Sequence, residues 1–373
     1  MKISAAVKYS GQPAFVIEEV ELEAPRDDEI LVRVVGVGLC HTDLVFAGRE
    51  DAYPFPAVFG HEGSGVVEAV GKNVTKVKSG DRVTMTFRAC GDCDRCANGD
   101  AAYCRTMPML NYIGSRADGS KALSNAEGAV SSNFFGQSSF ATHALTYEQN
   151  VVIVDEDIPL EIAGPLGCGI QTGAGGVMRS LAAKAGSSIL IIGGGPVGLS
   201  AVMGAKIQQC ETIILMEPQP SRRELALEFG ATHVLDPVEA GDLVTAVRAI
   251  VPMGLDYAFD TAGIPEVLQS VMGCLGSMGT LGVVGISPPG TPVPGDLSTL
   301  MTFGQSVRGI IEGDSNPDEF IPELIEHYRA GRLPFDKLIK TYPLSEINQA
   351  IADQHAGKCV KVVLLPGDGG IVG

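Results

Sequence analysis

Residues 187–209 read SSILIIGGGPVGLSAVMGAKIQQ. A short apolar run is followed by three glycines and a proline, and then by apolar residues at helical spacing. This order predicts a buried strand, a tight turn and a helix. A run of this length also raises the possibility of a membrane-spanning helix, but the Gly-Gly-Gly-Pro at 193–196 would break such a helix. We therefore expect a soluble protein with no membrane partner.

The glycine-rich turn has the pattern G-x-G-x-x-G between a strand and a helix, which is the setting that binds the pyrophosphate of a dinucleotide. A plain strand–helix turn without a ligand is the alternative reading. The predicted cofactor contacts in the turn are Gly193, Gly195, Pro196, Val197 and Gly198.

The next predicted strand, TIILMEP at 212–218, ends in Glu217. A carboxylate at that strand end can accept hydrogen bonds from ribose hydroxyls, and it would repel a 2′-phosphate. NAD is therefore predicted in preference to NADP. Arg222 and Arg223 leave NADP open, because either side chain could reach a 2′-phosphate.

Strands and helices alternate around this unit, which predicts an α/β protein with a doubly wound parallel sheet. The sequence before it is rich in short β-branched runs, so a β-rich domain should come first. A late strand should return to that first domain. The expected strands are 29–40, 62–71, 81–87, 255–263, 280–286 and 358–366, and the expected helices are 176–185, 221–230, 267–279 and 320–333.

Composition narrows the function further. The 373 residues suit two domains, and 27 basic against 44 acidic residues give a net charge of −17. Such a surface argues against nucleic acid and against anionic membranes as partners. The N-terminal sequence has no apolar segment typical of a signal peptide, and the nine cysteines are not spaced as a disulfide framework. A reducing, cytoplasmic location is predicted.

Four cysteines fall close together, with the spacing C-x2-C-x2-C-x7-C. Four thiolates at such spacing can close a tetrahedron around zinc and leave no open position, so a structural zinc is predicted. A cluster of buried thiols and a nucleic-acid-binding zinc ribbon are the alternatives, and the acidic residues between the cysteines argue against the ribbon. The four residues are Cys90, Cys93, Cys96 and Cys104.

A second, dispersed set consists of Cys40 in GLCHTD, His61 in FGHEGSG and Cys168 in GPLGCGIQTG. Two cysteines and a histidine form a zinc site with a fourth position left for water or substrate. Asp43 could orient the imidazole, and Glu62 could approach the metal. Taken alone, a buried cysteine is more often a small hydrophobic residue and a lone histidine more often structural.

With these motifs in place, the chain resembles the zinc-dependent medium-chain alcohol dehydrogenases. Gly60-His61-Glu62-x2-Gly65-x5-Gly71-x2-Val74 fits their zinc signature, and the four-cysteine lobe, the segment 164–175 and the glycine-rich turn follow in the family's order. The resemblance covers essentially the whole chain. Segments 36–44, 134–145 and 217–237 are most similar to the aryl-alcohol and geraniol-type branches.

The resemblance implies a GroES-like catalytic domain at 1–169 and 312–373 and a Rossmann domain at 170–311. It implies one catalytic and one structural zinc per chain, with Cys40, His61 and Cys168 as catalytic ligands and Glu62 as an alternate ligand. Thr42 would receive the substrate proton. The remaining implied contacts to the cofactor are His41 at the pyrophosphate, Thr172 at the nicotinamide, Glu217 and Arg222 at the adenosine ribose, and Lys361 at the pyrophosphate.

The implied activity is the reversible, NAD-linked oxidation of a primary aromatic or allylic alcohol to its aldehyde. An aliphatic or thiol-adduct alcohol dehydrogenase is the alternative, and a non-catalytic zinc- and nucleotide-binding protein is another. Phe134 and Phe135 are predicted to line the substrate pocket. Val45 stands where liver-type relatives have a relay histidine. A homodimer or homotetramer is expected, joined at a sheet edge at 280–286.

Overall fold

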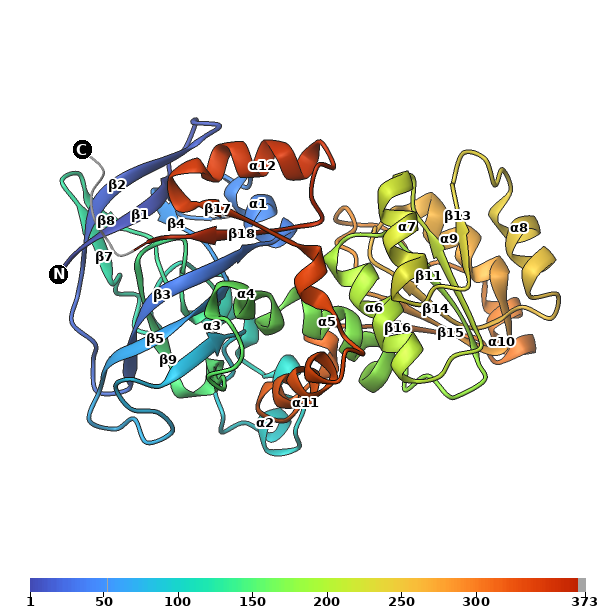
Figure 1. Cartoon of the computed structure of the whole chain (residues 1–373), viewed down its shortest axis with the longest axis horizontal. Helices are drawn as coiled ribbons and strands as arrows, with labels where there is room; N and C mark the ends of the chain where they lie inside the picture. The colour runs from blue at the N-terminus through green and yellow to red at the C-terminus, as the bar shows by residue number, and fades with distance from the viewer. Residues whose placement is uncertain (52, 368–373) are drawn as a thin grey trace. The chain divides into compact units, whose positions relative to one another are not determined.

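A computed structural model describes residues 1–51 and 53–367. The chain forms two compact units. The first comprises Met1–Cys168, Asn316–Ile325 and the chain from Asp336 onward, and the second comprises Gly169–Ser315 and Glu326–Phe335. Each unit has its own sheets (Figure 1).

The first unit is rich in β-structure, as predicted. One of its sheets has the order β4-β1-β2-β7-β8, and the other has the order β10-β6-β5-β3-β18-β17 with β9 also paired to β3. The strands are β1 (Lys2–Lys8), β2 (Phe15–Leu22), β3 (Glu29–Leu39), β4 (Ala57–Val58), β5 (Glu62–Val70), β6 (Arg82–Met85), β7 (Leu123–Asn125), β8 (Gly128–Val130), β9 (His143–Tyr147), β10 (Val151–Ile153), β17 (Ile339–Pro343) and β18 (Lys361–Leu365).

Strand β3 organises the larger sheet, because β5, β9 and β18 all pair with it. The pairing of β18 with Val37–Leu39 confirms that the late strand returns to the first part of the chain. The helices of this unit are short, except for the one that precedes β18. They are α1 (His41–Ala47), α2 (Asp94–Ala97), α3 (Met107–Asn111), α4 (Leu160–Ala163) and α12 (Ile347–His355), while α11 (Pro317–Arg329) runs on into the second unit.

The second unit has a six-stranded parallel sheet in the order β13-β12-β11-β14-β15-β16, which confirms the doubly wound fold. Its strands are β11 (Ser188–Ile192), β12 (Thr212–Met216), β13 (His233–Leu235), β14 (Leu255–Asp260), β15 (Leu275–Val283) and β16 (Ser306–Gly309). The helices are α5 (Gly169–Gly175), α6 (Pro196–Ile207), α7 (Pro220–Phe229), α8 (Leu243–Ile250), α9 (Pro265–Cys274) and α10 (Leu297–Phe303).

The core of this unit follows from the apolar strands. Leu190 and Ile214 of neighbouring strands are fully buried, and Val247 of α8 and Val271 of α9 pack in the same cluster. Helix α6 packs against α5 and α7. The order reverses between β11 and β14, which is the point where nucleotides bind in such sheets.

Three expectations about this unit need correction. Residues 176–185 do not form a regular helix: a single π turn spans Gly176–Ser180 and the helix ends there. The helix expected at 267–279 stops at Cys274, because β15 begins at Leu275. Segment 280–286 is not a sheet edge, because β15 pairs with β16 as well as β14.

In the part of the chain that the structure describes, no helix combines the length and the apolar character needed to cross a bilayer.

Candidate catalytic metal centre

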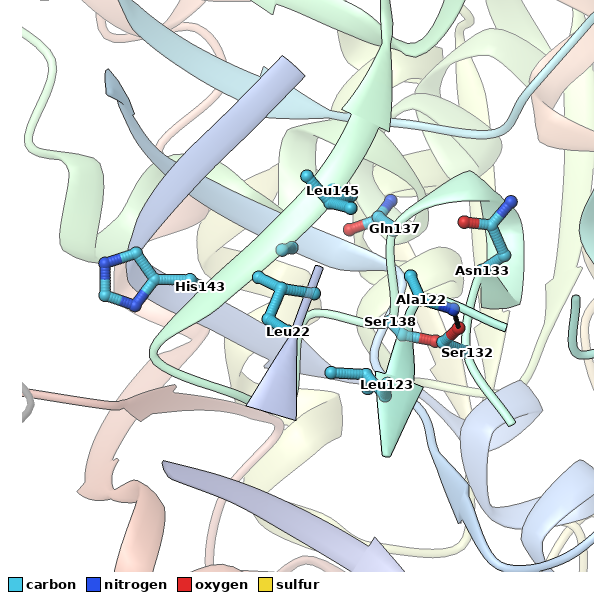
Figure 2. Close-up of a pocket in the computed structure, with 10 residues that line it drawn as sticks. Leu22, Ala122, Leu123, Ser132, Asn133, Gln137, Ser138, His143 and Leu145 are labelled. Carbon is cyan, nitrogen blue, oxygen red and sulfur yellow. Dashed lines mark hydrogen bonds between the residues drawn. The ribbon is translucent and has the colours of Figure 1, made fainter. Parts of the chain in front are cut away.

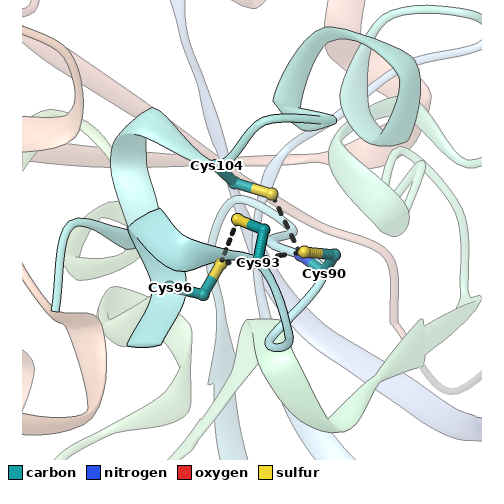
Figure 3. Close-up of side chains that lie close together, drawn as sticks. All are labelled: Cys90, Cys93, Cys96 and Cys104. Carbon is teal, nitrogen blue, oxygen red and sulfur yellow. Dashed lines mark hydrogen bonds between the residues drawn. The ribbon is translucent and has the colours of Figure 1, made fainter. Parts of the chain in front are cut away.

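The four-cysteine lobe forms a compact group, as Figure 3 shows. The Sγ atoms of Cys93 and Cys96 lie 3.6 Å apart, and those of Cys90 and Cys96 lie 3.9 Å apart. These distances are far longer than a disulfide bond. They match the roughly 3.8 Å edge of a tetrahedron of thiolates around zinc, calculated from a Zn–S distance of about 2.3 Å. The lobe therefore fits the predicted structural zinc.

Local structure favours thiolates in part of this lobe. Main-chain hydrogen bonds, first from Arg105, lower the pKa of Cys93 to about 6. Burial instead raises the pKa of Cys96 to about 12. A bound dication would resolve this conflict, because it stabilises all four thiolates together.

The dispersed set also converges. One ligand atom each from Cys40, His61, Glu62 and Cys168 lies within 4.8 Å of the others. Strand register explains part of this, because Gly38 at the end of β3 is opposite Glu62 at the start of β5. A side chain on Gly38 would collide with the Glu62 carboxylate, with its Cβ 1.8 Å from Oε2. A larger residue at this position would displace the Glu62 carboxylate.

Asp43 organises two of the ligands. Its carboxylate accepts hydrogen bonds from the main-chain N–H of Cys40 at 3.0 Å and that of Gly60 at 3.0 Å, and it lies 2.8 Å from Nδ1 of His61. The bond to Cys40 is part of a capping box that starts α1. A proton on Nδ1 facing this carboxylate leaves the lone pair of Nε2 free.

That Nε2 atom is the clearest sign of a metal site. It is buried and has no hydrogen-bond partner among the residues that the structure describes. Although burial lowers it, the charges of Asp43 and Cys40 raise the pKa of His61 well above its ordinary value. The pKa of Cys40 is lowered well below its ordinary value, first by a hydrogen bond with Cys168. Two thiols and an imidazole nitrogen form the donor set of a catalytic zinc.

Lys361 lies inside this group and pairs with Glu62. Its Nζ is 2.5 Å from Oε2 of Glu62 and donates to the carbonyl oxygen of Leu39 at 3.1 Å. Burial lowers the pKa of Lys361, but the charges of Glu62 and Cys40 outweigh it, and the pKa is raised. The predicted contact of Lys361 with the pyrophosphate stays a prediction.

The other predicted residues of α1 lie beside the ligands. The hydroxyl of Thr42 is 3.8 Å from the Sγ of Cys40. His41 is exposed at the start of the helix, and Val45 is half-buried one turn later. The role of Thr42 in proton transfer and the contact of His41 with the pyrophosphate stay predictions.

Phe134 and Phe135 are buried and contact the centre through His61. The ring of Phe135 stacks on the imidazole at 4.3 Å between centroids and 22° between planes, and the ring of Phe134 meets it edge-on at 5.7 Å. Phe134 also contacts Phe46, Tyr53 and Phe59. The two rings thus belong to an aromatic cluster, and their contact with substrate stays a prediction.

A small cavity borders the same segment. Figure 2 shows Leu22, Asn133, Gln137, Ser138 and Leu145 among the residues that line it. Its volume of about 10 Å³ is close to the lower limit for one water molecule. An alcohol substrate therefore cannot bind in this cavity.

The glycine-rich turn in the second unit fits a dinucleotide. Gly195 caps the start of α6, and a Cβ there would meet nothing within 4 Å, so a phosphate has room at the helix N-terminus. The carboxylate of Glu217 accepts from the N–H of Gly194 at 2.6 Å and that of Gln219 at 2.8 Å.

The two arginines that follow Glu217 differ. Arg223 pairs with Asp236 at 2.7 Å and donates to the carbonyl oxygen of Glu217. Nε of Arg222 is buried without a partner within the described residues. Arg222 is therefore the arginine whose side chain is available to a ribose or phosphate.

Thr172 lies in α5, and its hydroxyl is 3.4 Å from the carboxylate of Glu312.

Sequence reasoning missed two parts of the centre. The pairing of Lys361 with Glu62 joins distant segments, and no local signal predicts it. Gln137 also escaped notice, although its side chain donates to the carbonyl oxygen of His61 at 2.8 Å. The available signal in the sequence was a glutamine within an apolar, glycine-containing segment.

Comparisons with known proteins agree with this geometry. Residues 26–156 match the family described as alcohol dehydrogenase GroES-like domain, and residues 196–328 match zinc-binding dehydrogenase. The chain is 46% identical over 365 residues to geraniol dehydrogenase of Castellaniella defragrans, covering 97% of each chain. It is 32% identical to S-(hydroxymethyl)glutathione dehydrogenase of Saccharomyces cerevisiae, covering 98% of this chain and 96% of that one.

Among solved structures, benzyl alcohol dehydrogenase from Acinetobacter calcoaceticus is similar with a TM-score of 0.94 and 41% identity, covering 98% of this chain and 99% of that one. The GroES-like and Rossmann parts expected from the sequence are thereby confirmed. The two metal-binding groups, the nucleotide turn and these matches lead to one assignment: the chain belongs to the zinc-dependent medium-chain alcohol dehydrogenase family.

Proposed function

We propose that this protein catalyses the reversible, NAD-linked oxidation of primary aromatic or allylic alcohols to aldehydes. The observation on which this depends most is the converged group of Cys40, His61 and Cys168, with an unpartnered imidazole nitrogen facing two thiols. Similarity to a geraniol dehydrogenase and to a benzyl alcohol dehydrogenase supports the substrate class.

In this proposal Cys40, His61 and Cys168 hold the catalytic zinc, and Glu62 is an alternate ligand. Zinc in such a site supplies a Lewis acid that makes an alcohol proton easier to remove. Asp43 fixes the tautomer and direction of His61. Lys361 pairs with Glu62 and thereby stabilises it as a carboxylate within a buried site.

Thr42 is the proposed first acceptor of the substrate proton, because its hydroxyl lies beside Cys40. A hydroxyl can accept one proton while it donates its own, so it can pass a proton on without becoming charged. Val45 cannot continue such a relay. Exposed His41 is the nearest proposed exit.

When bound, NAD would supply the hydride acceptor, and the residues of this chain would fix its position and electrostatic surroundings. We propose contacts from Gly193, Gly195, Pro196, Val197 and Gly198 to the pyrophosphate, from Glu217 and Arg222 to the ribose, and from Thr172 to the nicotinamide. The Glu217 carboxylate disfavours a 2′-phosphate, so NAD is the proposed cofactor.

Phe134 and Phe135 are the proposed aromatic neighbours of the substrate. An aromatic pair adds about 0.5–1.5 kcal/mol to plain burial. A phenyl or allylic group would gain this contact, whereas ethanol has no such surface. Because one relative is an S-(hydroxymethyl)glutathione dehydrogenase, a thiol-adduct substrate is the proposed alternative.

We further propose a homodimer or homotetramer in the cytoplasm. Helix α10 precedes the edge strand β16, and two of its apolar side chains are largely exposed to solvent. The exposed fraction is 84% for Leu297 and 80% for Met301. Such apolar patches favour association. Light scattering that finds only monomer would contradict the assembly.

The proposed catalytic domain is 1–169 with 312–373, and the proposed NAD domain is 170–311.

One assay tests the main proposal. NADH formation is followed at 340 nm with benzyl alcohol, geraniol, ethanol and S-(hydroxymethyl)glutathione side by side. The proposal expects kcat/KM for the first two to exceed that for the others. Comparable values for ethanol and benzyl alcohol would refute the substrate class, and a preference for the glutathione adduct would select the alternative.

A further inference from the structure

Residues 133–139, here called the support loop, have a strained backbone. Asn133, Phe135 and Ser138 all have positive φ, at 66°, 52° and 54°. A bulky residue such as phenylalanine rarely adopts this conformation, because it is sterically unfavourable. Strain of this kind persists only where the surroundings impose it.

The side chain of Gln137 supplies much of that restraint, and all of its hydrogen-bonding groups are used. Its Nε2 donates to the carbonyl oxygen of His61 at 2.8 Å and to that of Thr86 at 3.2 Å. Its Oε1 accepts from the N–H of Gly63 at 3.1 Å and from the hydroxyl of Ser139 at 2.9 Å. One buried amide therefore bonds the main chain on both sides of Glu62, at His61 and at Gly63.

Thr86 extends this connection to the third ligand segment. Its hydroxyl donates to the carbonyl oxygen of Gly167 at 2.6 Å. Gly167 directly precedes Cys168. A continuous series of buried hydrogen bonds thus runs from His61 through Gln137 and Thr86 to the residue before Cys168.

The support loop also restrains the His61 ring itself. Phe135 stacks on the imidazole at 4.3 Å, while Asp43 holds its Nδ1. Asp43 joins Cys40 to His61, but these three hydrogen bonds do not reach the segment of Cys168. The two networks are complementary, because each fixes a different pair of ligand segments.

We propose that Gln137 and Thr86 are positioning residues that hold the His61 and Cys168 segments at the spacing required by the catalytic zinc. This rests on the proposed function, which places zinc between those ligands. Partners that orient metal ligands in this way contribute about 10–100-fold to metal affinity. The strain in the support loop is then the cost of bringing Gln137 and Phe135 to His61.

Thr86 gives the sharpest test, because two substitutions separate the hydroxyl from the packing. Thr86→Val keeps the shape but loses the bond to Gly167, and Thr86→Ser keeps the hydroxyl. Thr84→Val is the matched control: Thr84 of β6 is as buried as Thr86, and its hydroxyl donates to the carbonyl oxygen of Ala163 at 3.1 Å and to that of Gly63 at the longer distance of 3.5 Å. Gln137→Met tests the other half of the network.

The measurement is zinc retention by the full-length protein against a competing chelator, with the Cys90–Cys104 lobe as an internal reference. We expect Thr86→Val and Gln137→Met to lower the affinity of the catalytic site about 10–100-fold without changing the lobe. Thr86→Ser and Thr84→Val should retain the wild-type affinity. Cobalt placed in the catalytic site should show altered absorption bands in the first two variants only.

The outcomes separate this inference from the proposed function. If the wild type binds only the lobe zinc, the proposed function fails. If the wild type binds two zinc ions and Thr86→Val retains both as tightly, the positioning role is refuted. Equal loss of affinity in Thr84→Val and Thr86→Val would also refute it, because general destabilisation would then explain the result. If Gln137→Met does not fold, the comparison of Thr86→Val with Thr86→Ser still tests the positioning role.

Discussion

Replacing Asp43 with asparagine should weaken the catalytic centre by an amount that the structure defines. The carboxylate faces three N–H groups, from Cys40, Gly60 and the His61 ring. A carboxamide of the same shape has one accepting oxygen, so its NH2 group must face at least one of these donors. At least one hydrogen bond to a charged group is lost, which costs about 1.5–3 kcal/mol. If this loss falls on the metal-bound state, zinc affinity drops about 10–150-fold.

Chelator competition, with both zinc ions counted per chain, measures the change. Asp260→Asn is the control, because Asp260 is fully buried in the second unit and accepts from the N–H of Gly263 at 2.8 Å. Both variants should lose stability, but only Asp43→Asn should lose catalytic zinc. Asp43→Asn that binds zinc within threefold of the wild type would refute the reasoning.

Cys168→Ser should abolish turnover with little change in thermal unfolding, whereas Cys93→Ser should lower the unfolding temperature, since closed zinc sites stabilise folding; equal unfolding in both would contradict the division of roles. Glu217→Ala should reduce the preference for NAD over NADP in kcat/KM, and equal use of both cofactors by the wild type would count against it. Thr42→Ala should reduce kcat far more than it changes KM, so normal turnover would exclude it from the relay. Burial alone would raise the pKa of Glu29, but hydrogen bonds from Arg116 and from the main-chain N–H of Arg26 outweigh it, and the pKa is lowered. The ion pair of Glu29 with Arg116 therefore stabilises the fold above the ordinary carboxyl pKa of 4.5, and this stabilisation is lost as the pH falls through the lowered pKa. Urea unfolding should therefore show a deficit for Glu29→Gln at pH 7 that shrinks in acid, and a pH-independent deficit would contradict this.

Local patterns predicted the parts of the centre whose residues are close in sequence or tied to one turn. The spacing of the four cysteines predicted their cluster, and the position of Asp43 three residues after Cys40 predicted that it could orient the imidazole. The glycine-rich turn and Glu217 likewise lie together, because adjacent parallel strands bring their ends to one edge.

Contacts that depend on pairing between strands distant in the sequence could not be predicted. Lys361 meets Glu62 only because β18 pairs with β3, and sequence periodicity does not specify that partner. The edge strand β16 was missed because four residues, SVRG, are too short and polar for a strand signal. The pocket role of Phe134 and Phe135 stays a prediction, and their burial among other rings depends on packing that the sequence does not reveal.

The pairing of β18 with β3 has a consequence for biosynthesis. Val37–Leu39 and Glu62 are synthesised early, and the whole of Gly169–Ser315 emerges before Lys361. Until then, Val37–Leu39 of β3 lack their β18 partner, although β9 already pairs with Glu29–Arg33, and the Glu62 carboxylate lacks its cation. The nascent protein therefore passes through a stage in which the end of this strand is unpaired, and unpaired strand edges are prone to aggregation. The metal centre reaches its final form only after both units have been translated.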